Sequence, residues 1–96
     1  MRFNLSCCLD SMASVAGSLG CDTKGQTSLE AAESAIAAVV QLQHAVSIRT
    51  RLSDLGLARE QIPWVASKAF QIKRLMDVNP RRATEMDLVK IIESAF

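Results

Sequence analysis

Residues 72–96 read IKRLMDVNPRRATEMDLVKIIESAF, and this stretch decides the fold. We expect a helix to end near Asp77, because a residue that precedes proline is pushed out of the helical region and Pro80 cannot continue a helix. Thr84 then offers its side-chain oxygen to the free N–H groups of a new helix. Asp87, three residues later, completes a capping box or favours the positive helix end. The stretch therefore predicts two helices joined by a stiff polar corner.

The last helix is predicted to be amphipathic. Its apolar residues recur at helical spacing and predict one buried stripe, formed by Leu88, Ile91, Ile92 and Ala95. Physical reasoning alone indicates a helical domain here and identifies no reaction.

The corner itself, Asn79, Pro80 and Arg81, followed by a threonine-capped terminal helix, resembles the C-terminus of the iron-containing (group III) alcohol dehydrogenases. The likeness extends to Met1–Asn4, Arg51–Gly56 and the residues before the corner, Ile72, Arg74, Leu75 and Met76. In that family such a segment follows a metal-binding helix with the motif His-Gly-x-x-x-Ala-x-x-Leu-Pro-x-Val-Met-x-Phe-Asn. The resemblance places the start of this chain at the Met of the motif, after the ligand histidine, and covers the last quarter of a full-length enzyme.

The resemblance implies an all-α fold, a small bundle of four main helices plus short turns. It also implies that NAD(P) and an iron or zinc ion are bound by parts of the enzyme that lie upstream. The family's metal ligands are one Asp and three His, and no residue of this chain matches them. The sequence also lacks the glycine-rich phosphate loop that follows a strand. We therefore expect no catalytic, cofactor-binding or metal residue in this chain, and no activity from it alone.

Composition restricts the classes of function. Ninety-six residues predict a single domain, 1–96, and 49% apolar residues are enough for a folded core. Eleven basic against ten acidic residues give a net charge of +1, which provides no general attraction to nucleic acid or anionic membranes. With one Trp, three Phe and no Tyr, few side chains could stack on bases. No run approaches the ~20 apolar residues of a membrane span.

The cysteines bear on localisation. Cys7, Cys8 and Cys21 are an odd number without Cys-x-x-Cys spacing, so we interpret them as reduced thiols of a cytoplasmic protein. An alternative is an export signal, with Arg2 as its positive start and Ser18–Cys21 similar to a lipoprotein cleavage box. Polar residues interrupt its apolar region, which favours an amphipathic helix instead.

Two helices are predicted in the first half of the chain. The first runs from about Leu5 to Leu19 and is stopped by Gly20. A second capping box, Thr27 with Glu30, opens a long helix that ends near Ala45. Apolar and small residues lie around most of its circumference, so we expect it to be the central helix of the bundle.

The second half begins with short turns. Gly56 is predicted to end one turn, and Arg59–Gln61 to form another. A helix then runs from about Pro63 to Met76, with Pro63 in its first turn, where the missing N–H costs little. Its inward side is predicted to be Ile62, Val65, Ala66, Ala69, Ile72 and Met76, with Trp64 off that stripe.

Two groups of residues could suggest other functions. His44 is the one histidine, and near a helix end it is better explained as a solvated or dipole-favoured residue than as a metal ligand. Lys73, Arg74, Arg81 and Arg82 could present a helix-turn-helix to phosphates. We favour the alternative that they stabilise helix ends and the corner, which predicts no nucleic-acid binding.

Three interpretations of function stay open at this point. The first is a stand-alone, non-catalytic helical module that acts through protein contacts, as a homodimer through apolar surface that a complete enzyme would bury. The alternative is one piece of a split NAD-dependent, metal-dependent alcohol dehydrogenase that needs a separate chain for cofactor and metal. A remnant without a selected role is the third.

Overall fold

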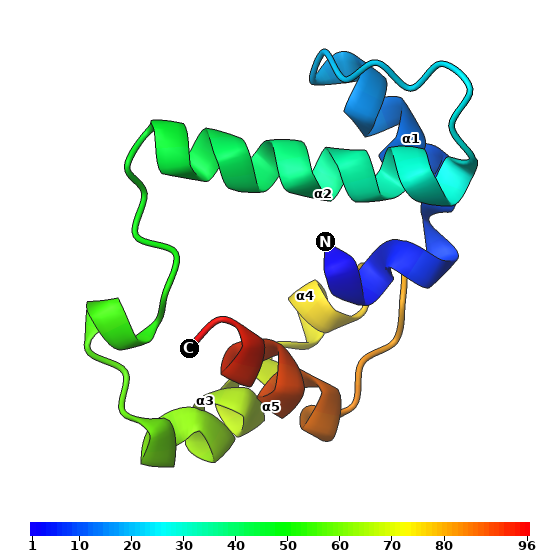
Figure 1. Cartoon of the computed structure of the whole chain (residues 1–96). Coiled ribbons are helices and arrows are strands. Elements are labelled where there is room, and N and C mark those ends of the chain that lie inside the picture. Colours follow the sequence, from blue (N-terminus) through cyan, green and yellow to red (C-terminus); the bar gives the residue numbers. More distant parts are fainter. The chain divides into compact units, whose positions relative to one another are not determined.

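The computed structural model describes all residues from Met1 to Phe96 and contains helices but no strand. This confirms the all-α prediction (Figure 1). The elements in chain order are the 3₁₀ helix η1 (Arg2–Cys7), α1 (Leu9–Ser18), α2 (Ser28–Ala45), η2 (Ser53–Leu55), η3 (Arg59–Gln61), α3 (Ile62–Phe70), α4 (Lys73–Met76) and α5 (Glu85–Ser94). The four longest, α1, α2, α3 and α5, are the four main helices that the sequence predicts.

The residues group into two compact units, Met1–Ile48 and Arg49–Phe96. That the whole chain forms one domain stays a prediction. None of the helices combines the length and the hydrophobicity that crossing a membrane requires.

In the first unit, α1 packs on α2 through small side chains. The buried residues are Met12, Ala16, Ala31, Ala32, Ala35 and Ile36. Alanines at a helix contact let the two backbones approach closely, since the distance between packed helices depends on the side chains between them. The core of this unit is therefore a tight contact between two helices rather than a layer of large side chains.

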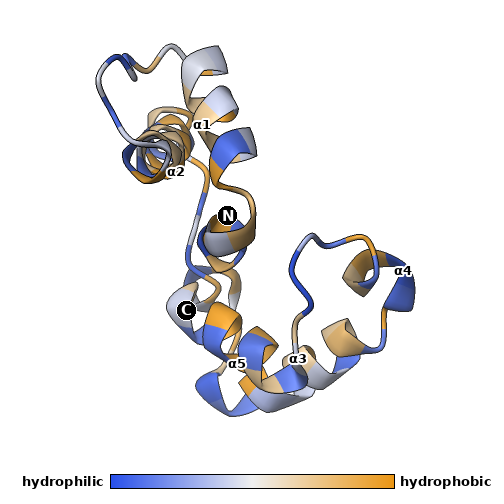
Figure 2. Cartoon of the chain, turned by 90° about the vertical axis from the view of Figure 1, so that its right-hand side faces the viewer, coloured by the Kyte–Doolittle hydropathy of each residue, from blue (hydrophilic) through white to orange (hydrophobic).

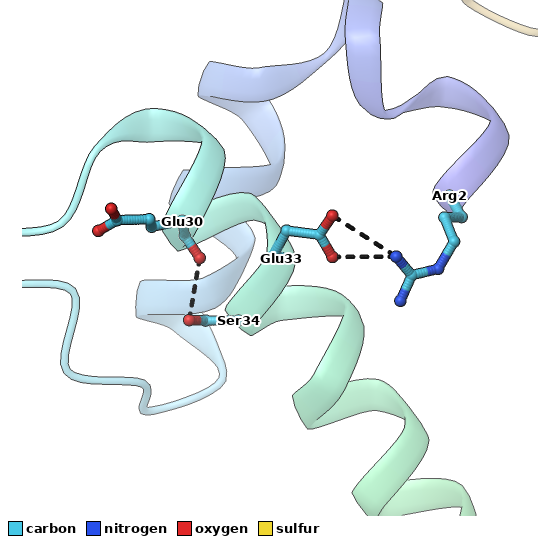
Figure 3. A network of polar contacts seen from close by, with 4 residues as sticks. All are labelled: Arg2, Glu30, Glu33 and Ser34. Carbon is cyan, nitrogen blue, oxygen red and sulfur yellow. Dashed lines mark hydrogen bonds and ion pairs between the residues drawn. The ribbon is translucent and has the colours of Figure 1, made fainter.

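The start of α2 is fixed by the predicted capping box. The Glu30 amide donates to Thr27 Oγ1 at 3.2 Å, and the Thr27 amide donates to the Glu30 carboxylate at 3.3 Å. One turn on, the Ser34 hydroxyl donates to the Glu30 carbonyl at 3.0 Å (Figure 3). Arg2 of η1 reaches the carboxylate of Glu33 at 3.1 Å in an exposed ion pair, which contributes roughly 0–1 kcal/mol.

Within the first unit, the C-terminal half of α2 is uncovered. All buried residues of α2 lie between Ala31 and Ile36, and Figure 1 shows α1 beside the N-terminal part only. Val40, Leu42 and Val46, further along, are exposed. Within this unit α1 is the one element that packs closely against α2, and that α2 is the central helix of the whole bundle stays a prediction.

The first predicted helix, Leu5 to Leu19, is divided in the structure. The backbone at Cys8 leaves the helical region, with φ −134° and ψ 30°, and separates η1 from α1. The Cys8 amide donates to Leu5, three residues back, whereas the Met12 amide donates to Cys8, four residues back. The apolar residues keep their helical spacing across this break, so the sequence pattern does not reveal it. The predicted stop at Gly20 is confirmed, with φ 81°.

The predicted helix from Pro63 to Met76 is also two helices, α3 and α4. Ile72 between them has ψ 75°, which no helical residue adopts, and its side chain is exposed rather than inward. The predicted place of Pro63 in the first turn of α3 is confirmed, and Trp64 is exposed, off the buried stripe, as predicted. Gly56 ends η2 with φ 92°, and η3 is the predicted second turn.

In the second unit, α3 packs on α5 with little burial. Ile62 and Ala66 of α3 are its buried residues. No residue of α5 is buried, and Ile91 is exposed, so the predicted buried stripe is only half-covered. Figure 2 shows hydrophobic and hydrophilic residues alternating along α5, as expected of an amphipathic helix that lacks part of its cover.

Polar contacts hold the chain end in this unit. The Leu52 amide donates to the Ala95 carbonyl at 2.8 Å, and the Ser53 hydroxyl donates to the Phe96 carbonyl at 2.6 Å. The Arg59 guanidinium lies 4.7 Å from the centre of the Phe96 ring. These contacts satisfy carbonyls at the end of α5 that would otherwise have no partner in the helix.

Candidate functional site

The corner between α4 and α5 is the region that the sequence singles out. α4 ends at Met76, close to the predicted end at Asp77. The side-chain amide of Asn79 donates to the carbonyl of Arg81, so that Asn79 closes the turn on either side of Pro80. Asn79 is half-buried, whereas Pro80 and Arg81 are exposed. The corner therefore fixes the direction of the chain with local hydrogen bonds.

Thr84 and Asp87 form the predicted capping box at the start of α5. The Asp87 amide donates to Thr84 Oγ1 at 3.1 Å, and the Thr84 amide and hydroxyl each donate to the Asp87 carboxylate at 2.9 Å. The hydrogen bonds from Thr84 lower the pKa of Asp87, and the positive charges of Arg81 and Lys90 lower it further. The carboxylate thus stabilises the start of α5 through its hydrogen bonds with Thr84.

A small depression lies beside the corner. It is lined by Phe70, Lys73, Met76, Asp77, Arg82 and Ala83, and its volume is about 90 Å³. The ammonium group of Lys73 lies 5.5 Å from the centre of the Phe70 ring, a cation–π contact. Pockets that hold drug-sized ligands or cofactors are roughly 300–1,000 Å³. The depression is therefore too small for a dinucleotide.

The basic residues around the corner are partly balanced by acidic ones. Lys73 and Arg74 are the first two residues of the single-turn helix α4, not the last turn of a long helix as predicted, because the chain breaks at Ile72. Asp77 lines the same depression as Lys73 and Arg82. With Asp77 among them, these basic side chains do not form a uniformly positive surface for phosphates.

The side chains do not fit an iron or zinc site. No group of three or more His, Cys, Asp or Glu side chains lies close enough together to hold a metal ion. His44 is exposed in the last turn of α2, where its position suits the helix dipole. Structural and catalytic metal sites take three or four such donors, so this donor set is inadequate.

Sequence reasoning did not single out two features. Phe70 of α3 was not among the corner residues, although its ring lies against Lys73 across the break between α3 and α4. Residues three apart also face each other on a continuous helix, so the spacing of Phe70 and Lys73 could have indicated this contact. The sulfurs of Cys7 and Cys8 lie 3.6 Å apart at the break between η1 and α1. In the sequence, only the adjacency of the two cysteines indicated this close pair of thiols.

Known proteins resemble the chain over its whole length. The model of the Fe-containing alcohol dehydrogenase family, C-terminal, matches residues 1–96. The 1,3-propanediol dehydrogenase of Klebsiella pneumoniae is 33% identical over 99% of this chain and 24% of its own length. The lactaldehyde reductase of Escherichia coli strain K12 is 33% identical over 100% of this chain and 25% of its own length.

A solved structure shows the same fold. The crystal structure of a 1,3-propanediol oxidoreductase matches with a TM-score of 0.94 at 33% identity, over 99% of this chain and 25% of that chain. The chain thus spans about a quarter of the length of the relatives that it matches. On the match over residues 1–96 and the shared fold, the chain belongs to the iron-containing alcohol dehydrogenase family and corresponds to a part of its C-terminal region.

Proposed function

We propose that these residues perform no redox chemistry themselves and act through protein contacts, as the helical part of an NAD(P)-dependent, iron-containing alcohol dehydrogenase. Their role is to pack against the portion of such an enzyme that binds the metal and the cofactor. The relatives are named for the oxidation or reduction of small alcohols and aldehydes, among them 1,3-propanediol and lactaldehyde. An alcohol or aldehyde of that size is the substrate class that the complete assembly would take.

The observation that supports this proposal is the uncovered apolar surface. Five of the eight buried residues are alanines, and none of the large side chains is fully buried. Leu42 and, four residues later, Val46 at the C-cap of α2 are exposed on one side of the helix, and we call them the α2 face. A monomer rarely exposes such side chains in a group unless another polypeptide covers them.

The candidate covering partner is the part of such a dehydrogenase that lies outside the matched region. The solved relative with the same fold has three quarters of its chain outside the matched region. Fully burying one exposed leucine side chain is worth about 1.5–3 kcal/mol, and Leu42 is 54% exposed, so covering the rest of the α2 face would contribute on the order of 1–3 kcal/mol to docking. The metal and cofactor would then be held by that larger portion, because this chain lacks a suitable donor set.

Complementation tests the proposal. The 1,3-propanediol dehydrogenase of Klebsiella pneumoniae, shortened so that it lacks the region matched here, is produced together with the chain of Met1–Phe96. We expect the two polypeptides to co-purify and NAD-dependent oxidation of 1,3-propanediol to appear only when both are present. Separate elution of a folded 96-residue chain from a folded shortened enzyme would contradict the proposal.

A matched pair of variants tests the surface. Leu42→Asp places a charge on the α2 face and should weaken the complex at least about tenfold, which corresponds to 1.4 kcal/mol. Gln41→Asp places the same charge on the neighbouring exposed position of α2 and should leave binding unchanged. Circular dichroism of each variant alone shows whether the helices persist.

Self-association is the second candidate. The same α2 face in two copies could pair and give a non-catalytic homodimer, since the face is equally exposed in both. Light scattering behind a sizing column, over a range of protein concentrations, distinguishes the two candidates. A discrete dimer that Leu42→Asp converts to monomer favours self-association, and a monomer that binds the shortened enzyme favours the dehydrogenase assembly.

A further inference from the structure

Two thiols face each other at the break between η1 and α1. Cys7 Sγ and Cys8 Sγ lie 3.6 Å apart, and neither is in a disulfide. Consecutive residues of a regular helix are turned by about 100° and do not face each other. The backbone of Cys8 is not helical, and its φ of −134° sets a different position of the Cys8 side chain relative to Cys7, where the two sulfurs meet. At this break, two cysteines that are adjacent in the sequence therefore also have their thiols close together.

The separation of the sulfurs suits chelation of a single centre. Two bonds of about 2.3 Å from thiolates to one atom, at angles between 90° and tetrahedral, place the sulfurs about 3.3–3.8 Å apart. The observed 3.6 Å lies in this range. A vicinal disulfide is less favourable, since adjacent Cα atoms are about 3.8 Å apart and disulfides usually need at least about 4.4 Å.

The exposure of the two thiols and the residues around them define the class of ligand that they can bind. Cys7 is exposed and Cys8 half-buried, so a small molecule can reach both thiols. The chain provides no third His, Cys, Asp or Glu to complete a metal site there. The ligand must then be a soft centre that needs two protein sulfurs and brings its remaining substituent with it. A trivalent arsenic atom with one organic substituent meets that requirement.

We propose that Cys7 and Cys8 form a dithiol site that chelates thiophilic centres needing two protein ligands, with monosubstituted trivalent arsenicals as the chemical class. Two As–S bonds form, and the As=O bond of an organic arsenic(III) oxide breaks. Both thiol protons leave with that oxygen as one water molecule, and no oxidation state changes. The site does not depend on the proposed dehydrogenase assembly.

The state of the thiols agrees with this chemistry. The hydrogen bond with Cys7 raises the pKa of Cys8, and its partial burial acts in the same direction. Cys8 is therefore a protonated thiol at neutral pH, which disfavours reagents that need a thiolate. An arsenic oxide accepts the thiol protons on its own oxygen, so the reaction proceeds with the protonated pair.

Phenylarsine oxide is the probe, and Cys21 is the internal control. Cys21 is a half-buried thiol that donates to the Ser34 carbonyl at 3.8 Å, away from the pair. Mass spectrometry of the intact folded chain should show one phenylarsenic adduct that survives excess 2-mercaptoethanol and is removed by 2,3-dimercaptopropanol. Cys7→Ser and Cys8→Ser should each weaken binding at least about 100-fold, and Cys21→Ser should leave it unchanged.

Several results would overturn the proposal. Loss of the adduct in Cys21→Ser, or its persistence in Cys7→Ser or Cys8→Ser, would place the arsenic on other thiols. Equal affinity of the folded chain and the urea-unfolded chain would show that the break at Cys8 does not prepare the site. Weaker binding after unfolding, together with the expected variant pattern, would support it.

Discussion

The two units of the chain begin a helix in the same way and cover it differently. α2 in the first unit starts with the Thr27–Glu30 capping box, and α5 in the second starts with the Thr84–Asp87 box. Four residues of α2 are buried, mostly against α1, whereas α5 has none. Caps thus determine where a helix begins, but burial depends on which neighbours are present.

The two units are also stabilised in different ways. The first unit depends on close packing of alanines between α1 and α2. The second depends on two buried residues of α3 and on hydrogen bonds that hold residues 95 and 96. A substitution that removes burial should therefore harm the second unit most, and one that adds bulk should harm the first.

The largest effect is expected for Ile62→Ala. Ile62 is 2% exposed and is the one large buried side chain of the second unit, so its loss should cost about 2–5 kcal/mol. Hydrogen exchange followed by mass spectrometry should show lost protection in α3 and α5 and unchanged protection in α2. Trp64→Ala, at a residue 64% exposed in the same helix, should change stability by less than about 0.5 kcal/mol. Equal loss of protection in α2 would contradict the separation of the two units.

An intermediate effect is expected for Ala32→Leu in the first unit. Ala32 is fully buried where α1 packs on α2, and extra methylenes in a tight contact cost about 1–3 kcal/mol. Urea unfolding measures the change, and Ala37→Leu, on an exposed position of the same helix, is the matched control. If both variants lose the same stability, helix propensity rather than close packing explains the result.

Local sequence features predicted most of the element boundaries. Both capping boxes, the glycine stops at Gly20 and Gly56 and the position of Pro63 are correct, because each depends on a few neighbouring residues. The breaks at Cys8 and Ile72 were missed, since the apolar spacing continues in phase across them. Burial along α5 was overestimated, because it depends on neighbours that an amphipathic pattern does not specify.

The candidate site shows the same limit. Asn79, Thr84 and Asp87 could be assigned from the sequence because their partners are within three residues. The Cys7–Cys8 pair lies at a helix break that the pattern did not predict, and neighbouring residues of a regular helix do not face each other. This pair therefore could be recognised only from the structure.

The smallest effect is a pH dependence of α5 that depends on Asp87. Its folded-state pKa is lowered by the hydrogen bonds from Thr84 and by the charges of Arg81 and Lys90. The carboxylate therefore adds stability above its ordinary pKa, and this contribution is lost as the pH falls through the lowered value. Asp87→Asn lacks the titrating group, so its stability relative to wild type should be lower at neutral pH and converge with it in acid. Urea unfolding at several pH values measures this difference, and a constant difference would show that the charge of Asp87 does not stabilise the helix start.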